Sequence, residues 1–276
     1  MKHGDSLDVA GGRLYYEVDG DGPALTLIHA GVAHLRMWDE QVAAWRERWR
    51  VIRYDTRGFG QTTTDDVPYS NRDDLRRLLD HLGVERTHLL GASRGGSIAV
   101  DFALEQPDRV RSLVMVAAGF SGHQGPDEGI DWDAVEALWK ERRWEELVER
   151  ETQIWTDGPG QPTGRVDADV RRRMVEWNLE NYRAGQPAEQ AQPIDPPAAG
   201  RLAEIGVPAL VVWGDLDTLG VTSACERLCR KMRNARRHVL AGVAHMVNLE
   251  RPAQFNRLVA DFLAEVDAAA ARPAAG

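Results

Sequence analysis

Short apolar runs alternate with amphipathic segments along most of the chain. Runs near residues 24–29, 87–92, 111–117 and 208–213 are apolar almost throughout, which is typical of strands buried on both faces of a sheet. Segments such as 37–46 place apolar residues at helical intervals instead. The alternation predicts an α/β fold with a mostly parallel, eight-stranded sheet flanked by helices.

The same pattern predicts the following full set of strands and core helices. Strands are expected near 7–11, 13–18, 24–29, 50–55, 87–92, 111–117, 208–213 and 236–241. Helices are expected near 37–46, 69–82, 95–105, 222–232 and 251–266.

The alternation stops between about residues 121 and 202, where prolines and amphipathic runs replace strand patterns. We therefore expect a core formed by 1–120 and 203–267, a helical insertion at 121–202 and a frayed tail at 268–276. Five of the tryptophans lie in the insertion. They either join its helices to each other and to the core, or one or two of them cover an apolar pocket.

Ser93 stands in a Gly-x-Ser-x-Gly frame directly after an apolar run. This frame is typical of a strained strand-to-helix turn that projects a serine hydroxyl at the end of a sheet. Gly91 and Gly95 let the backbone close, and the Arg94 amide then points to where an oxyanion would form. The alternative is an ordinary strand–helix turn.

A base and an acid follow in the order expected for an activated serine. The apolar segment 208–213 leads into a loop that contains Asp215 and Asp217, and a later strand leads into a loop that ends at His245. Because parallel strands bring their carboxyl ends to one edge, we expect these side chains to meet Ser93. Asp215 and Asp217 both remain candidates for the acid at this point.

Five motifs in this order make the chain resemble the alpha/beta-hydrolase superfamily, in the branch of small esterases and lactonases. They are the His29-Ala30-Gly31 loop, the Asp55-Thr56-Arg57-Gly58-Phe59-Gly60 turn, the elbow around Ser93, the Gly214-Asp215-Leu216-Asp217 loop and the Ala244-His245 loop. The resemblance covers nearly the whole length and implies that residues 121–202 form a helical cap.

The resemblance also implies roles for particular residues. Ser93, Asp217 and His245 would form the catalytic triad, with Asp217 selected by the family's Gly-x-x-Asp pattern. The backbone amides of Gly31 and Arg94 would form the oxyanion hole. Ala30 departs from the usual His-Gly, so that Gly31 is expected to take the permissive backbone position, and His29 is expected to brace the loop.

The substrate pocket candidates are Arg94, Val32, Trp132, Trp155 and Met246. Arginine directly after the nucleophile is unusual, because many relatives carry an apolar residue there. Its side chain either forms a fork to a substrate carboxylate or carbonyl, or packs under the cap with its head on an acid or in solvent.

Composition and net charge limit the classes of molecule that the protein is expected to bind. The net charge of −9 argues against a nucleic-acid binder, and no apolar run approaches the roughly 20 residues needed to cross a bilayer. Without a hydrophobic leader, the expected location is the cytoplasm. Cys225 and Cys229 are expected to be reduced helix residues and not a metal site. We expect a monomer or homodimer that acts on a small molecule without metal or organic cofactor.

The expected reaction is hydrolysis of a small carboxylic ester or lactone through an acyl-serine. A first alternative keeps the scaffold for another reaction: carbon–carbon bond hydrolysis, cofactor-free haloperoxidase chemistry, or a biosynthetic lyase or cyclase. A second alternative is a ligand-binding receptor with slow turnover. Fold alone does not separate these.

Overall fold

A computed structural model describes residues 4–126, 129–185 and 190–271. The strands are β1 (Asp5–Val9), β2 (Gly12–Asp19), β3 (Ala24–Ile28), β4 (Arg50–Tyr54), β5 (Thr63–Thr64), β6 (Thr87–Ala92), β7 (Val110–Val116), β8 (Ala209–Gly214) and β9 (Ala235–Leu240). The α-helices are α1 (Asp39–Trp45), α2 (Asn71–His81), α3 (Arg94–Glu105), α4 (Trp132–Lys140), α5 (Trp144–Thr152), α6 (Ala168–Ala184), α7 (Leu219–Lys231), α8 (Val247–Glu250) and α9 (Pro252–Ala270).

The strands of this described part form one sheet in the order β1-β2-β4-β3-β6-β7-β8-β9. From β4 to β9 the neighbours are parallel, whereas β1, β2 and β4 pair antiparallel. All eight predicted strands are present, and the additional two-residue β5 pairs with β2. The central strands β3, β6 and β8 are buried along their whole length, which explains why they are nearly continuous apolar runs.

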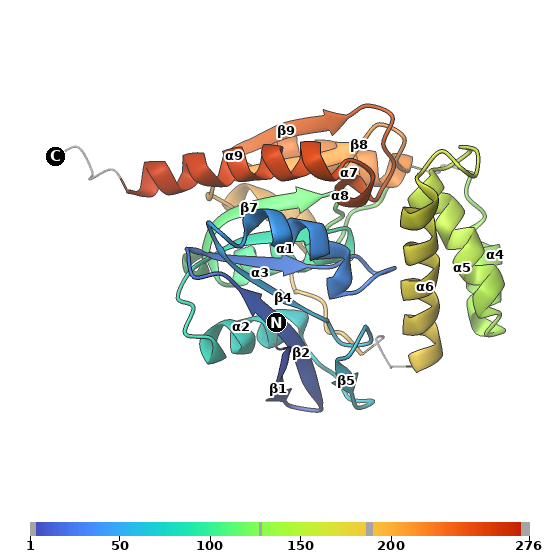
Figure 1. The fold of residues 1–276 in the computed structure, drawn as a ribbon, viewed down its shortest axis with the longest axis horizontal. Coiled ribbons are helices and arrows are strands. Elements are labelled where there is room, and N and C mark those ends of the chain that lie inside the picture. The colour runs from blue at the N-terminus through green and yellow to red at the C-terminus, as the bar shows by residue number, and fades with distance from the viewer. Residues whose placement is uncertain (1–3, 127–128, 186–189, 272–276) are drawn as a thin grey trace.

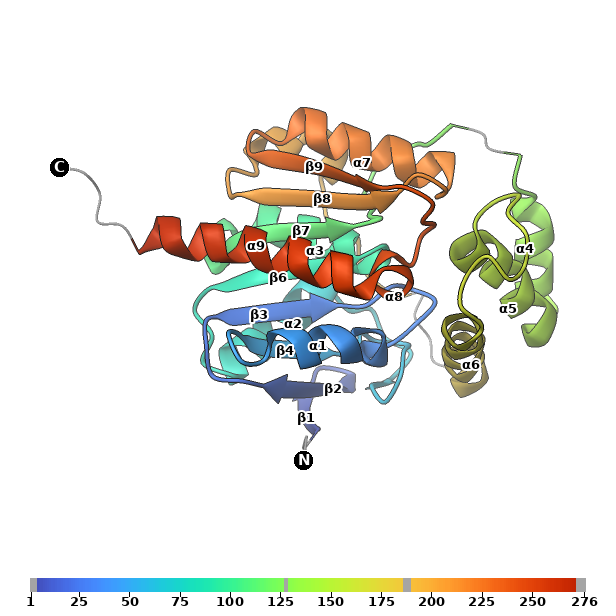
Figure 2. The same ribbon diagram turned by 45° about the horizontal axis from the view of Figure 1, so that its top comes forward.

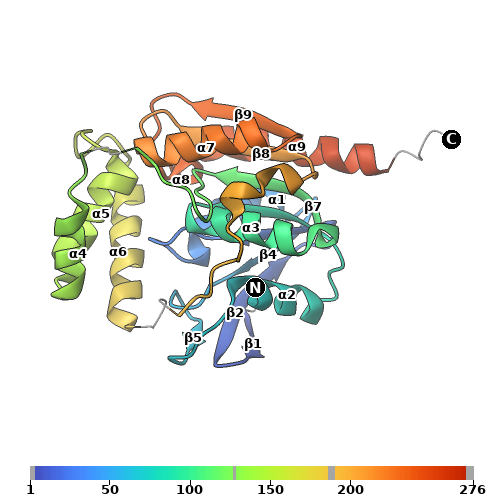
Figure 3. The ribbon, with the colours of Figure 1, turned by 180° about the vertical axis from the view of Figure 1, so that it is seen from behind.

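Helices cover both faces of the sheet. Helices α1 and α9 pack on one face, and α2, α3 and α7 lie on the other (Figures 1 and 3). Each face contributes its own apolar cluster. The cluster on the α1 and α9 side includes three buried tryptophans, Trp38, Trp45 and Trp49.

Helices α4, α5 and α6 stand beyond the end of the sheet toward which the arrowheads of β3, β8 and β9 point (Figure 2). They contact each other through the α5–α6 and α4–α5 pairs. Between α5 and α6 the chain forms one π-helical turn, Gln153–Asp157. These helices therefore lie over the carboxyl edge, where polar residues following the parallel strands gather.

The C-terminal prediction is partly wrong. Helix α9 continues to Ala270, and the amide of Ala271 still donates to the Asp267 carbonyl over 3.1 Å. The alanines at 268–270 are therefore helical and not frayed, in keeping with alanine's high helix propensity. The rest of the predicted tail, residues 272–276, lies outside the described residues.

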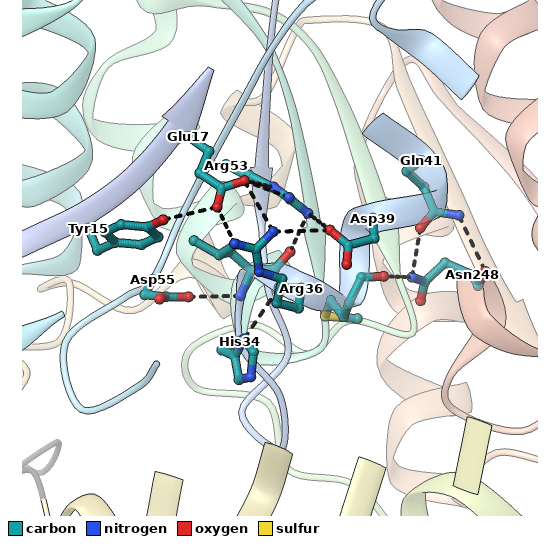
Figure 4. Close-up of polar contacts among 11 residues, drawn as sticks. Tyr15, Glu17, His34, Arg36, Asp39, Gln41, Arg53, Asp55 and Asn248 are labelled. Carbon is teal, nitrogen blue, oxygen red and sulfur yellow. Dashed lines mark hydrogen bonds and ion pairs between the residues drawn. The ribbon is translucent and has the colours of Figure 1, made fainter. Parts of the chain in front are cut away.

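A buried charged network supports the segment that follows the His29-Ala30-Gly31 loop (Figure 4). Arg53 on β4 is 1% exposed and donates to Glu17 on β2 over 2.6 Å. The same guanidinium donates to Asp39 over 2.6 Å and to the Leu35 carbonyl over 3.1 Å. Arg36 also donates to Glu17, over 2.5 Å. The network thus ties β2 and β4 to the short 3-10 helix Leu35–Trp38 and to the start of α1.

Replacing Glu17 with glutamine is expected to lower the free energy of unfolding by about 3–5 kcal/mol, because Arg53 would remain buried without its compensating charge. Urea unfolding measures the change. The control is Glu265→Gln, which removes an exposed partner of Arg236 and is expected to change stability by less than about 1 kcal/mol. Equal effects of the two substitutions would contradict the prediction.

Candidate active site

The turn after β6 holds Ser93 in a strained backbone conformation. Its φ of 51° and ψ of −117° are unusual for a non-glycine residue. A methyl group on Gly91 would lie 2.2 Å from the Gly95 carbonyl oxygen, and one on Gly95 would lie 2.3 Å from the Ile28 carbonyl oxygen. Only glycine fits at both positions, so the local sequence dictates a sharp elbow that ends in a half-buried serine.

The loops after β8 and β9 are held together by backbone contacts. A methyl group on Gly214 would lie 2.0 Å from the Val243 carbonyl oxygen, so the close approach requires glycine. The Leu216 amide donates to the same carbonyl over 2.9 Å. The Asp215 carboxylate accepts from the Gly242 amide over 2.7 Å. Asp215 therefore serves the turn between these loops.

Asp217 is the carboxylate that reaches His245. Its Oδ2 and Oδ1 lie 2.8 and 3.0 Å from His245 Nδ1, and both side chains are almost fully buried. The Thr218 amide also donates to Asp217, over 2.7 Å. An ionised carboxylate only accepts hydrogen bonds, so the imidazole carries its proton on Nδ1, and Nε2 is left with a lone pair. This tautomer is the one that a general base requires.

Gly31 and Arg94 lie side by side at the ends of β3 and β6. A methyl group on Gly31 would lie 3.5 Å from Arg94 Cδ and 3.7 Å from its Cβ. Gly31 does not adopt a positive φ. The expectation that it takes a permissive backbone position because of Ala30 is therefore wrong. Ala30 is accommodated as a buried residue of the apolar cluster beneath α1.

His29 braces this loop, as the sequence suggested. It is fully buried, its Nε2 accepts from the Thr56 amide over 3.0 Å, and its Nδ1 donates to the Ala30 carbonyl over 2.8 Å. Burial is the main cause that lowers the pKa of His29 to about 3. The ring is therefore neutral and joins the loop after β3 to the turn after β4.

The buried imidazole of His29 makes stability sensitive to acid. Between about pH 6.5 and 3 the unfolded chain binds one more proton at this residue than the folded chain, so stability falls as the pH is lowered. In His29→Gln, the free energy of unfolding is expected to fall less steeply, by about 1.4 kcal/mol per pH unit between pH 6 and 4. Urea unfolding at several pH values tests this, and parallel profiles for the two proteins would contradict it.

The π-helical turn of the cap lies directly over the histidine. The Trp155 ring is 4.7 Å from the His245 ring, centroid to centroid. A methyl group on Gly158 would lie 3.0 Å from the Leu216 carbonyl oxygen and 3.2 Å from Ala244 Cβ. This part of the cap therefore rests on both loops that carry the polar pair. The Trp132 ring lies 5.8 Å from that of Trp155, centroid to centroid, in a tilted arrangement, but Trp132 is 42% exposed and therefore lies on the outer side of these helices.

Of the other predicted pocket residues, Met246 lies in the core, whereas Val32 and Arg94 are partly exposed at the carboxyl edge of the sheet. Met246 is buried within the α1 and α9 cluster, and Val32 packs against that cluster while remaining partly exposed. Arg94 is half-buried, and its head lies on the turn after β4, where it donates to Thr56 over 2.6 Å.

One contact between α6 and the core was not predicted from the sequence. Asn181 on α6 donates to the Ala33 carbonyl over 3.1 Å and accepts from the Gly60 amide over 3.1 Å. The His34 ring also lies 5.4 Å from that of Trp177 on the same helix. An asparagine inside an amphipathic helix carries no signal of such a bridge, because its partners are more than a hundred residues away.

Within the described residues, no helix combines the length and apolar character needed to span a membrane. In the same part of the chain, no cluster of three or more histidine, cysteine or acidic side chains is arranged to hold a metal ion.

Comparison with known proteins decides the family. The profile of the alpha/beta hydrolase fold matches residues 23–252. The chain belongs to the alpha/beta-hydrolase family. Its sheet order and the elbow at Ser93 agree with that assignment.

Relatives within the alpha/beta-hydrolase family suggest different substrates. The chain is 32% identical to a 2-hydroxy-6-oxononadienedioate/2-hydroxy-6-oxononatrienedioate hydrolase of Burkholderia vietnamiensis, covering 91% of both chains. A hydrolase of the same name from Paraburkholderia xenovorans is 35% identical, over 78% of this chain and 76% of the relative. An enol-lactonase from Burkholderia xenovorans, whose crystal structure is known, is 26% identical in sequence to this chain. The two folds superpose with a TM-score of 0.76, covering 94% of this chain and all of that one. The chain is thus similar both to hydrolases named for oxo-dienedioates and to an enol-lactonase.

Proposed function

We propose that this alpha/beta hydrolase uses Ser93, His245 and Asp217 to hydrolyse the carbon–carbon bond beside a ketone in a carboxylate-bearing, conjugated enol substrate. The observation that carries the chemistry is the buried Asp217–His245 pair on the same sheet edge as the strained Ser93. The substrate class rests on the relatives that are 32% and 35% identical to this chain.

The proposed reaction begins when Ser93 attacks the ketone carbon and His245 Nε2 accepts the hydroxyl proton. The amides of Gly31 and Arg94 hold the resulting oxyanion; one such donor is typically worth about 3 kcal/mol. The bond between the carbonyl carbon and its neighbouring carbon breaks only in the keto tautomer of the substrate, in which the enol proton has moved to that neighbouring carbon and made it a CH2 group. The electron pair of the broken bond is then delocalised along the conjugated chain as a dienolate. The imidazolium of His245 returns its proton to that fragment.

Water completes the proposed cycle. His245 deprotonates a water molecule, which attacks the acyl-serine and releases a carboxylic acid. One water is consumed in total: its oxygen enters the acid, and the other fragment gains one hydrogen. Asp217 keeps its charge throughout and stabilises the imidazolium.

Hydrolysis of an ester or lactone is the second candidate. The enol-lactonase with a TM-score of 0.76 supports it, and it requires the same residues. Only the leaving group differs, because an alkoxide oxygen takes the place of the delocalised carbon. The residues that contact the two ends of the substrate, and not the triad, would select between the two substrates.

The test compares both substrate classes on one preparation. Hydrolysis of 2-hydroxy-6-oxononadienedioate is followed by loss of its conjugated absorbance, and 4-nitrophenyl esters from acetate to octanoate are assayed in parallel. The proposal expects a higher kcat/KM for the dienedioate. Ester or lactone turnover without dienedioate turnover would favour the second candidate. A Ser93 adduct with a fluorophosphonate, detected by mass spectrometry, reports the activated serine in either case.

A further inference from the structure

The Arg94 side chain runs along the rim of the sheet. Its backbone follows Ser93 at the end of β6, and its Cβ and Cδ pass beside Gly31 at the end of β3. Its guanidinium donates to Thr56, which follows the end of β4. Since the sheet order is β4-β3-β6, the side chain spans two strands at the edge where the proposed reaction occurs.

The partners of the Arg94 guanidinium are neutral. It donates to Thr56 Oγ1 over 2.6 Å and to Asn71 Oδ1 over 3.4 Å, and it hydrogen-bonds to Tyr69. It also lies over the Phe59 ring, 4.8 Å from the centroid. Among the residues that the structure describes, no carboxylate forms an ion pair with it.

Two fully buried arginines of this core are each paired with a carboxylate. Arg53 lies 2.6 Å from Glu17, and Arg57 lies 2.7 Å from Asp74. A charge removed from water is stable only when it is paired and hydrogen-bonded. Burial lowers the pKa of Arg94, and the neighbours Tyr69 and Tyr54 act against this shift. A bound anion would compensate the positive charge of the Arg94 guanidinium.

A second unused polar group lies near the same head. Tyr54, at the end of β4, is 1% exposed, and its hydroxyl has no hydrogen-bond partner in the described part of the chain. The charge of Arg94 acts on this hydroxyl, in opposition to burial, which raises the pKa of Tyr54. A buried hydroxyl without a partner is uncommon in folded proteins and points to a missing acceptor or donor.

We propose that the Arg94 guanidinium and the Tyr54 hydroxyl form a subsite for a carboxylate group of the substrate. A guanidinium presents a planar fork of donors that matches a carboxylate, and the tyrosine adds one further donor. The subsite begins one residue from Ser93, so it selects substrates that carry the carboxylate a few bonds from the scissile carbonyl. This inference rests on the proposed function and assigns the carboxylate of its substrate to particular residues.

Two esters of equal chain length test the subsite. 4-Nitrophenyl hydrogen glutarate ends in a carboxylate where 4-nitrophenyl pentanoate ends in a methyl group. The readout is the ratio of kcat/KM for the glutarate ester to that for the pentanoate ester. Arg94→Met is expected to lower this ratio about 10- to 100-fold, which is the usual effect of losing hydrogen bonds to a charged group. Tyr54→Phe is expected to lower it about threefold to tenfold.

The matched control is Arg72→Met, which removes an arginine on α2 that already pairs with Glu105. Its ratio should equal that of the parent protein. If Arg94→Met does not fold, Arg94→Lys and Tyr54→Phe decide, because lysine keeps the charge without the fork and phenylalanine removes only an unpartnered hydroxyl. Ratios in the folded Arg94 variants within twofold of the parent would overturn the proposal.

A binding measurement separates this inference from the proposed reaction. Calorimetric titration of glutarate into the Ser93→Ala protein requires no turnover. We expect glutarate to bind and Arg94→Met, in the same background, to weaken binding at least tenfold. Absence of binding, or equal binding by both proteins, would overturn the subsite even if the enzyme hydrolyses carbon–carbon bonds. Binding that depends on Arg94 without any dienedioate turnover would uphold the subsite and reject the proposed reaction.

Discussion

Ser93→Ala is expected to lower kcat by about 10⁵- to 10⁶-fold on whichever substrate the enzyme turns over, because removal of the nucleophile disables the whole triad. The fold should persist, since alanine leaves the glycines of the elbow unchanged. Initial rates measure the loss, and mass spectrometry should show that the fluorophosphonate adduct disappears. Circular dichroism confirms that the variant is folded.

Ser97→Ala is the matched control for this prediction. Ser97 lies one turn further along α3, and its amide donates to the Ser93 carbonyl over 3.2 Å. Removing its hydroxyl is expected to leave kcat within about threefold, because no step of the proposed reaction uses it. Full activity in Ser93→Ala would remove the basis for a covalent mechanism and strengthen the interpretation of the chain as a different kind of enzyme on this scaffold.

Asp217→Asn is expected to lower kcat by about 10⁴-fold. The amide nitrogen of asparagine donates to His245 Nδ1, which then carries no proton, and Nε2 becomes protonated and unable to act as a base. The effect should appear in kcat at constant protein stability, which thermal unfolding checks. The rate should not recover at higher pH, because the fault lies in the tautomer and not in the charge of the acid.

Asp215→Asn provides the comparison within the same loop. Its carboxylate accepts from the Gly242 amide over 2.7 Å, and asparagine can retain that bond through its oxygen. We expect kcat to change by less than about threefold. A large loss in Asp215→Asn together with high activity in Asp217→Asn would reverse the assignment of the acid.

Several features follow from residues that are close together in the sequence. Gly91 and Gly95 make the elbow around Ser93 predictable, because the methyl groups they lack would collide with the backbone a few residues away or with the adjoining strand. The apolar runs of β3, β6 and β8 are predictable for a similar reason. A strand buried on both faces must be apolar along its whole length.

Other features depend on contacts between distant segments. The position of Trp155 over His245 depends on a π-helical turn between α5 and α6 and on the fit of Gly158 against the loops that carry Asp217 and His245. Helical periodicity cannot anticipate that turn, because it marks apolar faces and not the point at which one residue is added to a helical turn. The Asn181 bridge to Ala33 and Gly60 is unpredictable for the same reason of distance.

The sequence by itself determined the order of strands and helices, the family, and the serine, acid loop and histidine that the site would use. These depend on local glycine positions and on the period of apolar residues. The tertiary structure decided that Asp217 and not Asp215 meets His245, and that the Arg94 head reaches Thr56 among neutral partners. Both outcomes depend on how loops from separate strands approach at one edge of the sheet. That approach is set by packing across the fold and is not encoded in any short stretch of residues.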